Sequence, residues 1–366
     1  LATLDPTEAK AVLEAELSAQ VARIAGLALD DVDPDEPITA LGLDSLMVNQ
    51  LRNWIMAALK TQVTMMKLMM GPSVRALAGS LLDGSSDAAT EGNETNPFSK
   101  PIPAAPDADS YPVTSSQRRV LLLSHLDPSS VNYNIPVAVR IRADVDPERA
   151  LAAFRTLVQS YETLRTSFVF EGGEFRQRVH SRVDIEAAYD EFPETEVDLR
   201  LAAFFKPFDL GKAPLCRALV AKLAERDYLL VIEMHHSIID ANSGGILLDA
   251  FFRIYSGAEP EPERVRYRDY AVWEAGLRAD GAYAGSEAFW LDRLKGPLPS
   301  LDLPTDFPRP RRQSFEGDEV RFRLGPARVG QLKDLAAKTG ATLSMVLLAA
   351  FKTLLHRYSG QEDMIV

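Results

Sequence analysis

The sequence predicts a multidomain protein in which a small all-α bundle precedes a larger α/β domain. The chain has 366 residues, more than the ~100–200 residues of one ordinary domain. Apolar residues recur with helical spacing before residue 84, and strand-like and helix-like segments alternate after residue 110. A stretch rich in Ala, Ser, Pro, Asp and Glu separates the two patterns.

Composition excludes several classes of protein. The chain is 46% hydrophobic and 25% charged, with a net charge of −12, so it resembles a globular protein and has no basic footprint for nucleic acid. No apolar run reaches the ~20 residues of a membrane span, and the first ten residues do not form a signal peptide. The single cysteine, Cys216, excludes an internal disulfide. We therefore expect a soluble, cytoplasmic protein without a membrane or nucleic-acid partner.

The small domain spans residues 1–84. Apolar residues follow a helical stripe from Thr7 to Gly26, an acidic loop follows, a second helix starts at Asp44, and a last short helix runs from Val74 to Leu82. Residues 85–110 carry five acids and one base and lack periodicity, so we expect a flexible acidic linker. A chain of this length has an r.m.s. span of roughly 25–30 Å.

The larger domain begins at residue 111. Its expected strands are Ile135–Ile141, Leu164–Phe170 and Tyr228–Met234, and its expected helices are Pro147–Ser160, Gly244–Tyr255 and two within Leu332–Tyr358 that separate at Gly340. Interleaved strands and helices of this kind indicate an α/β or α+β domain.

Ser45 lies at the predicted start of the second helix, within the segment Gly42–Leu46 (GLDSL). A helix N-terminus offers free N–H groups and a positive dipole end, which suit a phosphate. Simple capping of the helix by Asp44 or Ser45 is the alternative. A hydrolase nucleophile is disfavoured, because the domain has no G-x-S-x-G elbow and no histidine.

Residues 1–84 resemble an acyl carrier protein of the polyketide-synthase type. The segment Gly42–Leu46 matches its attachment motif, and Gly71–Val74 matches the start of its last helix. The resemblance implies that Ser45 carries a covalent 4′-phosphopantetheine, added by a phosphopantetheinyl transferase, whose thiol holds an acyl chain.

His235 and His236 are the only adjacent histidines and follow an apolar predicted strand. Side chains alternate along a strand, so the two rings should point to opposite faces. This argues against a shared metal, and we expect no metal site. One ring would face a cavity while the other packs inward. Two structural histidines are the alternative.

The larger domain resembles the condensation domains of nonribosomal peptide synthetases, which are related to chloramphenicol acetyltransferase. Several ordered segments match family motifs: Ser115–Arg119, Tyr161–Phe168, His235–Asp240, Tyr267–Trp273, Leu303–Asp306 and Arg357–Gln361. The resemblance implies two acetyltransferase-like lobes that meet in a V around a tunnel. In this tunnel the acyl group of a thioester would be transferred to the amine of a carrier-bound amino acid.

The resemblance also assigns roles and partners. It makes His236, beside His235, the catalytic histidine, and it gives Asp240 a structural role that we expect to involve an ion pair with Arg165. Upstream polyketide synthase domains, downstream adenylation and peptidyl carrier domains, and a carrier–condensation contact in cis would complete a hybrid polyketide–peptide junction.

Two positions depart from the family pattern, and the second lobe looks short. Ala241 replaces a glycine, which would cost ~1–2 kcal/mol if φ were positive there, and Tyr161 replaces a histidine. We expect residues 111–300 to form the N-terminal lobe, and residues 301–366 the inter-lobe segment and the start of a truncated C-terminal lobe. Ester formation with a hydroxyl acceptor and a non-catalytic docking platform for the carrier remain alternatives.

Overall fold

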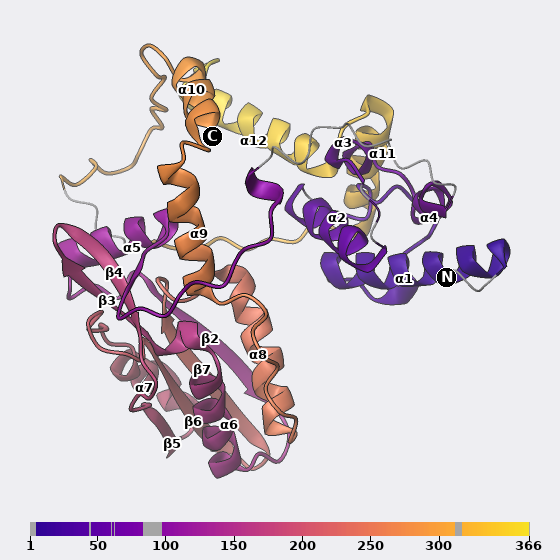
Figure 1. Cartoon of the computed structure of the whole chain (residues 1–366). Helices are drawn as coiled ribbons and strands as arrows, with labels where there is room; N and C mark the ends of the chain where they lie inside the picture. The colour runs from indigo at the N-terminus through magenta and orange to yellow at the C-terminus, as the bar shows by residue number, and fades with distance from the viewer. Residues whose placement is uncertain are drawn as a thin grey trace. The chain divides into compact units, whose positions relative to one another are not determined.

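The computed structural model describes residues 5–43, 45–59, 61, 63–82, 97–311 and 317–365. The chain divides into two compact units, Leu1–Ser99 with Asp292–Val366, and Lys100–Leu291 (Figure 1). The predicted linker 85–110 contains the boundary between the two units, because the first unit includes residues up to Ser99 and the second begins at Lys100. Residues 83–96 lie outside the described residues.

The N-terminal part of the first unit is all-helical. Its helices are α1 (Pro6–Ala25), η1 (Leu29–Asp31), α2 (Ser45–Leu59), α3 (Met65–Met69) and α4 (Val74–Leu82). Asp5 caps α1 by accepting hydrogen bonds from the N–H groups of Thr7 and Glu8, and Gly26 ends it in the left-handed conformation. The apolar stripes of these helices meet in one core that includes Leu17, Leu51, Ile55, Leu68 and Leu77, which gives the predicted helical bundle.

The C-terminal part of the first unit contains two consecutive helices, α11 (Pro326–Thr339) and α12 (Leu343–Ser359), with Gly340 between them in the left-handed conformation. Gln361 ties the end of α12 to an earlier segment: its side chain donates to the Ser300 carbonyl and accepts from the Asp302 N–H. In the described ranges no single helix is long and apolar enough to cross a membrane; α11 and α12 pass that test only as a pair bent by 102°.

The second unit is built on a four-stranded sheet with the order β2-β7-β6-β5. Its strands are β2 (Asn134–Ile141), β5 (Ala187–Glu191), β6 (Cys216–Ala224) and β7 (Asp227–His235). β7 pairs antiparallel with β2 and β6, and β5 pairs parallel with β6. β7 lies inside the sheet and has seven buried residues out of nine, as expected for a strand covered on both faces.

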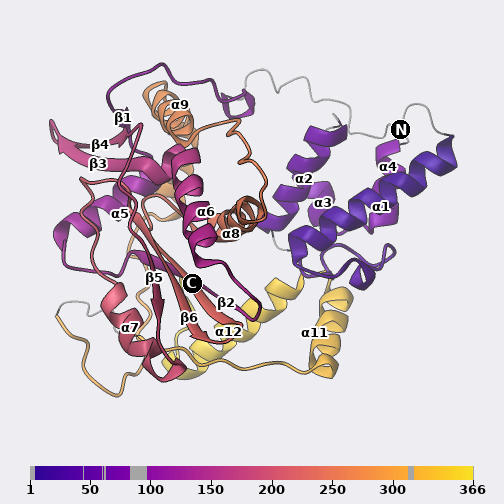
Figure 2. The same cartoon turned by 90° about the horizontal axis from the view of Figure 1, so that it is seen from below.

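Helices cover both faces of this sheet (Figure 2). On one face, Leu157 of α6 (Pro147–Ser160) and Phe251 of α8 (Ala241–Tyr255) share a core with Ala218 and Ile232. On the other face, α7 (Val197–Phe204) packs against Leu219, Ala221 and Val231. Because neighbouring residues of β6 and β7 belong to different clusters, the two layers follow directly from strand alternation.

A second, three-stranded sheet and three further α-helices complete the unit. The sheet has the order β1-β4-β3 and is antiparallel. The remaining elements are β1 (Tyr111–Pro112), α5 (Ser115–Leu126), η4 (Glu162–Arg165), β3 (Thr166–Glu171), β4 (Glu174–Val179), η5 (Glu194–Glu196), α9 (Tyr267–Ala279) and α10 (Ala284–Arg293), the last two residues of which belong to the first unit.

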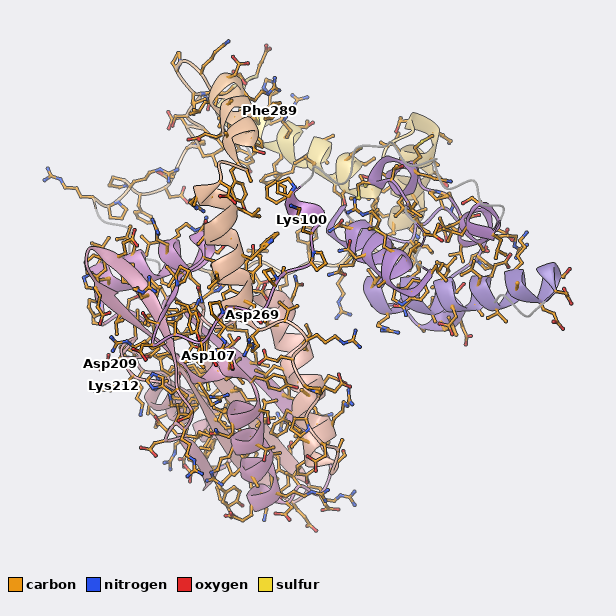
Figure 3. All side chains as sticks on the ribbon, viewed as in Figure 1. Lys100, Asp107, Asp209, Lys212, Asp269 and Phe289 are labelled. Atoms are coloured by element: carbon orange, nitrogen blue, oxygen red, sulfur yellow. The ribbon has the colours of Figure 1, made fainter. Side chains whose placement is uncertain are left out.

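Residues Lys100–Ser110, called the strap below, lie against α9 although the sequence predicts them as flexible linker (Figure 3). The N–H of Ala105 donates to Oδ1 of Asp269 at 2.9 Å, and Asp107 forms an ion pair with Arg268 at 3.2 Å. Asp269 is buried and also pairs with Arg266. The described linker residues are therefore held by charged groups of α9, which composition does not reveal.

Candidate active site

His235 is the last residue of the buried strand β7, and His236 is the first residue of the turn that leads into α8. The N–H of His235 donates to the Leu215 carbonyl at 2.9 Å, and the N–H of His236 donates to the Tyr133 carbonyl at 2.7 Å. A turn then places Asp240 at the N-cap of α8. The backbone of both histidines is thus fixed from neighbouring segments on each side.

The two histidine side chains lie in different places, as strand alternation predicts. His236 is exposed and lines a cavity of about 750 Å³ within the second unit, together with residues of α5, α8 and α9. His235 is buried and borders a different cavity of about 520 Å³, which has the aromatic side chains of Phe168, Phe170 and Phe175 in its wall. Only His236 is open to the larger cavity.

The hydrogen bond of His236 sets its tautomer. Nδ1 lies 2.9 Å from the carbonyl oxygen of Ile239. A carbonyl only accepts, so Nδ1 carries the proton and, in the neutral ring, Nε2 is left with a free lone pair. Such a ring is able to take a proton from a group in the cavity through Nε2.

His235 is held by two serines. The Ser237 N–H donates to its Nδ1, whose distance to Ser237 Oγ is 2.8 Å, and its Nε2 lies 3.2 Å from Ser124 Oγ. Burial, with a smaller contribution from His236, lowers the pKa of His235 to about 4. His235 is therefore neutral near pH 7, and its ring connects the end of β7 to Ser124 and Ser237.

Asp240 acts as a helix cap. Its Oδ1 accepts from the Ser243 N–H at 2.8 Å and from Ser243 Oγ at 2.6 Å. These bonds, the Ser243 hydroxyl first, lower the pKa of the Asp240 carboxyl. Ala241 is the first residue of α8, so its backbone is right-handed helical and the cost considered for a positive φ does not arise.

The expected ion pair between Asp240 and Arg165 is not formed among the described residues. Arg165 ends η4, and its Nη1 donates to the His180 carbonyl. The Asp240 carboxylate is already engaged at the start of α8. The prediction is wrong because helix capping gives this carboxylate local partners that the motif alone does not show.

Sequence reasoning also missed a buried ion pair beside His235. Arg217 and Glu233 are 2% and 0% exposed, and their side chains approach to 3.2 Å. Asn134 donates to Glu233 at 2.6 Å, and the Arg217 guanidinium stacks on Phe208, whose ring also contacts His235. The opposite charges on adjacent strands could have suggested the pair, but only the register brings them together.

Residues of the other motifs line the cavity. Gln117 donates to the Ser237 carbonyl at 3.1 Å and so links α5 to the histidine turn. Tyr161, which replaces the expected histidine, lies in the wall, and burial raises the pKa of its phenol. Tyr267 contacts the Thr114 hydroxyl at 3.1 Å. Glu263 was not singled out by any motif, yet it also lines the cavity.

Ser45 is the first residue of α2. Its side chain and Asp44 lie outside the described residues. The first turn of α2 itself contains no acidic residue. Gly42 has a φ of +93°, in the left-handed region, and among the described residues no atom lies within 4 Å of the position that a Cβ would take. This helix start fits a phosphate-linked group.

The chain matches two family models in the order of its parts. Residues 15–81 match the phosphopantetheine attachment site, and residues 107–366 match the condensation domain. The chain belongs to the condensation-domain family. It contains a carrier domain with a phosphopantetheine attachment site, followed by a condensation domain.

Curated relatives agree with this assignment. Tyrocidine synthase 2 of Brevibacillus parabrevis is 40% identical over 89% of this chain, and tyrocidine synthase 3 of the same organism is 37% identical over 99%. Gramicidin S synthase 2 of Aneurinibacillus migulanus is 39% identical over 81%. The chain spans 9%, 5% and 6% of these relatives' lengths.

Solved structures share the fold of the condensation domain. The X-domain from teicoplanin biosynthesis is 26% identical, with a TM-score of 0.64 over 71% of this chain and 60% of that one. The condensation domain from Monacolin K polyketide synthase MokA is 17% identical, with a TM-score of 0.59 over 69% and 61% of the two chains. The predicted fold class, a helical carrier before an α/β condensation domain, is confirmed.

Proposed function

We propose that the carrier presents an acyl thioester on Ser45 and that the condensation domain transfers the acyl group to the amine of an amino acid on a downstream carrier. The observation that carries this proposal is His236, which has a protonated Nδ1 bound to the Ile239 carbonyl and lies on the wall of a 750 Å³ cavity. A phosphopantetheinyl transferase and adenylation and peptidyl carrier domains are the partners this function requires.

The phosphopantetheine on the carrier would supply a thiol that holds the acyl group as a thioester. In the transfer, the amine nitrogen bonds to the acyl carbon, the carbon–sulfur bond breaks, one amine proton leaves and the released sulfur becomes a thiol. His236 Nε2 is the group able to accept the amine proton. General-base catalysis contributes a factor of ~10²–10⁴ in rate, which corresponds to ~3–5 kcal/mol of the activation barrier. Positioning of the two tethered reactants contributes ~7–11 kcal/mol. We therefore assign most of the acceleration to positioning.

The attachment residue is tested by intact mass spectrometry after incubation with coenzyme A and a phosphopantetheinyl transferase. We expect one phosphopantetheine on the wild-type chain and none on Ser45→Ala. A Ser45→Ala chain that still gains the group would show that another residue is modified.

The transfer is tested with a loaded carrier and an aminoacyl carrier as acceptor. We expect His236→Ala to slow amide formation by ~10²–10⁴, with the midpoint of thermal unfolding retained because the side chain is exposed. Equal rates for His236→Ala, for a variant lacking the condensation domain and for wild type would favour the docking-platform alternative. A hydroxyacyl acceptor in the same assay distinguishes ester formation.

We also propose a polyketide-type acyl chain as the donor, from the GLDSL sequence at Gly42–Leu46. The curated relatives named above are peptide synthases, so a peptidyl donor is the competing possibility. Mass spectrometry of the carrier isolated from its producing cells distinguishes them: a loaded acyl group without α-nitrogen supports the polyketide donor, and an aminoacyl or peptidyl group contradicts it.

A further inference from the structure

The cavity that contains His236 has an uneven charge. Its charged wall residues besides the histidine are Arg119, Asp240 and Glu263. The Asp240 carboxylate is engaged by Ser243, and Arg119 is exposed. The wall therefore contributes two carboxylates and one guanidinium.

Glu263 is only partly satisfied by the protein. Its Oε2 accepts the Glu162 N–H at 3.1 Å. Within the described ranges no hydrogen bond reaches Oε1, and no ion pair is formed by this carboxylate, although Arg165 and Arg266 act on it from a greater distance. A half-buried carboxylate in such surroundings is stabilised by a cation, because burial disfavours an unpaired charge.

The structural role of Glu263 does not require its charge. Holding the Glu162 N–H at the start of η4 needs only an acceptor oxygen, which glutamine would also supply. Burial raises the pKa of the Glu263 carboxyl, so the protein keeps an acid at a position where its ionised form is disfavoured. A cation in the cavity would favour the ionised form.

We propose that Glu263 is a specificity-determining residue that binds a protonated amine of the carrier-bound substrate in the His236 cavity. This inference rests on the proposed function, because it assumes that the condensation substrates enter this cavity. The amine belongs either to the α-carbon of an aminoacyl group or to a basic side chain, and both present the same ammonium chemistry to the carboxylate.

Two pairs of non-hydrolysable pantetheine amides separate these sources. The leucyl amide and the 4-methylpentanoyl amide differ in the α-amine, whereas the N-acetyl-lysyl and N-acetyl-norleucyl amides differ in a side-chain amine. Dissociation constants are measured by NMR titration of the 366-residue chain. We expect wild type to bind the cationic member of at least one pair about tenfold more tightly, as a charge-assisted hydrogen bond would give.

Glu263→Gln should bring that ratio close to one, while the midpoint of thermal unfolding stays near the wild-type value. Glu261→Gln is the matched control: it removes the same charge from the same loop, but Glu261 is exposed, pairs with Arg253 at 2.6 Å and does not line the cavity. The control should keep the wild-type ratio.

Ratios near one for both pairs in wild type, which need no variant to fold, would overturn the proposal, as would a ratio retained in Glu263→Gln. Failure of the proposed function is seen separately in the condensation assay. If amide formation depends neither on His236 nor on the presence of the condensation domain, that function fails. If it depends on His236 and the binding ratios are near one, only the role of Glu263 fails.

Discussion

At the scale of the residue, the adjacent histidines His235 and His236 have different surroundings. His235 lies inside the unit between Ser124 and Ser237, and His236 faces a large cavity with its Nε2 available. Strand alternation alone predicts the separation. Which ring faces the cavity was implied only by the family resemblance, because both faces of β7 are buried and the sequence does not distinguish them.

The pKa of His235 predicts a pH-dependent stability. Its folded pKa of about 4 lies below the ordinary value of about 6.5, so between these values the unfolded chain binds more protons and stability rises with pH. We expect the free energy of unfolding to fall by about 2 kcal/mol from this residue between pH 7 and pH 5, measured by urea denaturation. His235→Gln should lack this contribution; an identical pH dependence in the variant would contradict the assignment.

Asp240 should behave as a helix cap. Asp240→Ala removes the acceptor for the Ser243 N–H, and we expect a loss of ~0.5–2 kcal/mol in urea denaturation. This is less than the ~3–5 kcal/mol that breaking a buried ion pair would cost. Asp240→Asn, which keeps a capping oxygen, should lose less. Losses above 3 kcal/mol for both variants would indicate a partner that the cap does not explain.

At the scale of the element, the sequence predicts features that depend on neighbouring residues and does not predict pairings between distant strands. Helix α6 was predicted at its observed bounds because a proline starts it and a regular apolar stripe follows. The strand predicted from Leu164 begins at Thr166, since its first residues form the turn η4. β6 was missed: its sequence CRALVAKLA has no polar alternation, because the strand is covered on both faces.

The β6–β7 pair contains a buried charge network that should tolerate joint replacement better than single replacement. Arg217→Ala leaves Glu233, 0% exposed, without its cation, and we expect a loss of ~3–5 kcal/mol. Arg217→Met combined with Glu233→Leu removes both charges and should recover most of this loss. Urea denaturation of the single and double variants measures it; a double variant no more stable than the single one would show that the charges stabilise through other partners.

At the scale of the whole molecule, the strap changes the length of the connection between the two domains. Composition predicted a 26-residue linker ending at residue 110, but α9 already holds the chain at Ala105 and Asp107. Between the end of α4 at Leu82 and the strap at Lys100 lie residues 83–99. The sequence did not reveal this, because the binding groups lie more than 150 residues away.

The strap should depend on Asp269 more than on Asp107. Asp269 is buried and accepts the Ala105 N–H at 2.9 Å, whereas the Asp107 side chain is 94% exposed in its ion pair with Arg268. Exposed ion pairs contribute ~0–1 kcal/mol, and a hydrogen bond to a charged group contributes ~1.5–3 kcal/mol.

We expect Asp269→Ala to speed amide hydrogen exchange in peptides covering residues 100–110 at least tenfold, and Asp107→Asn to change it less than threefold. The core strands β6 and β7 should exchange as in wild type in both variants. Equal effects of the two substitutions would show that the strap is held by its charges as a group and not by the Ala105–Asp269 bond.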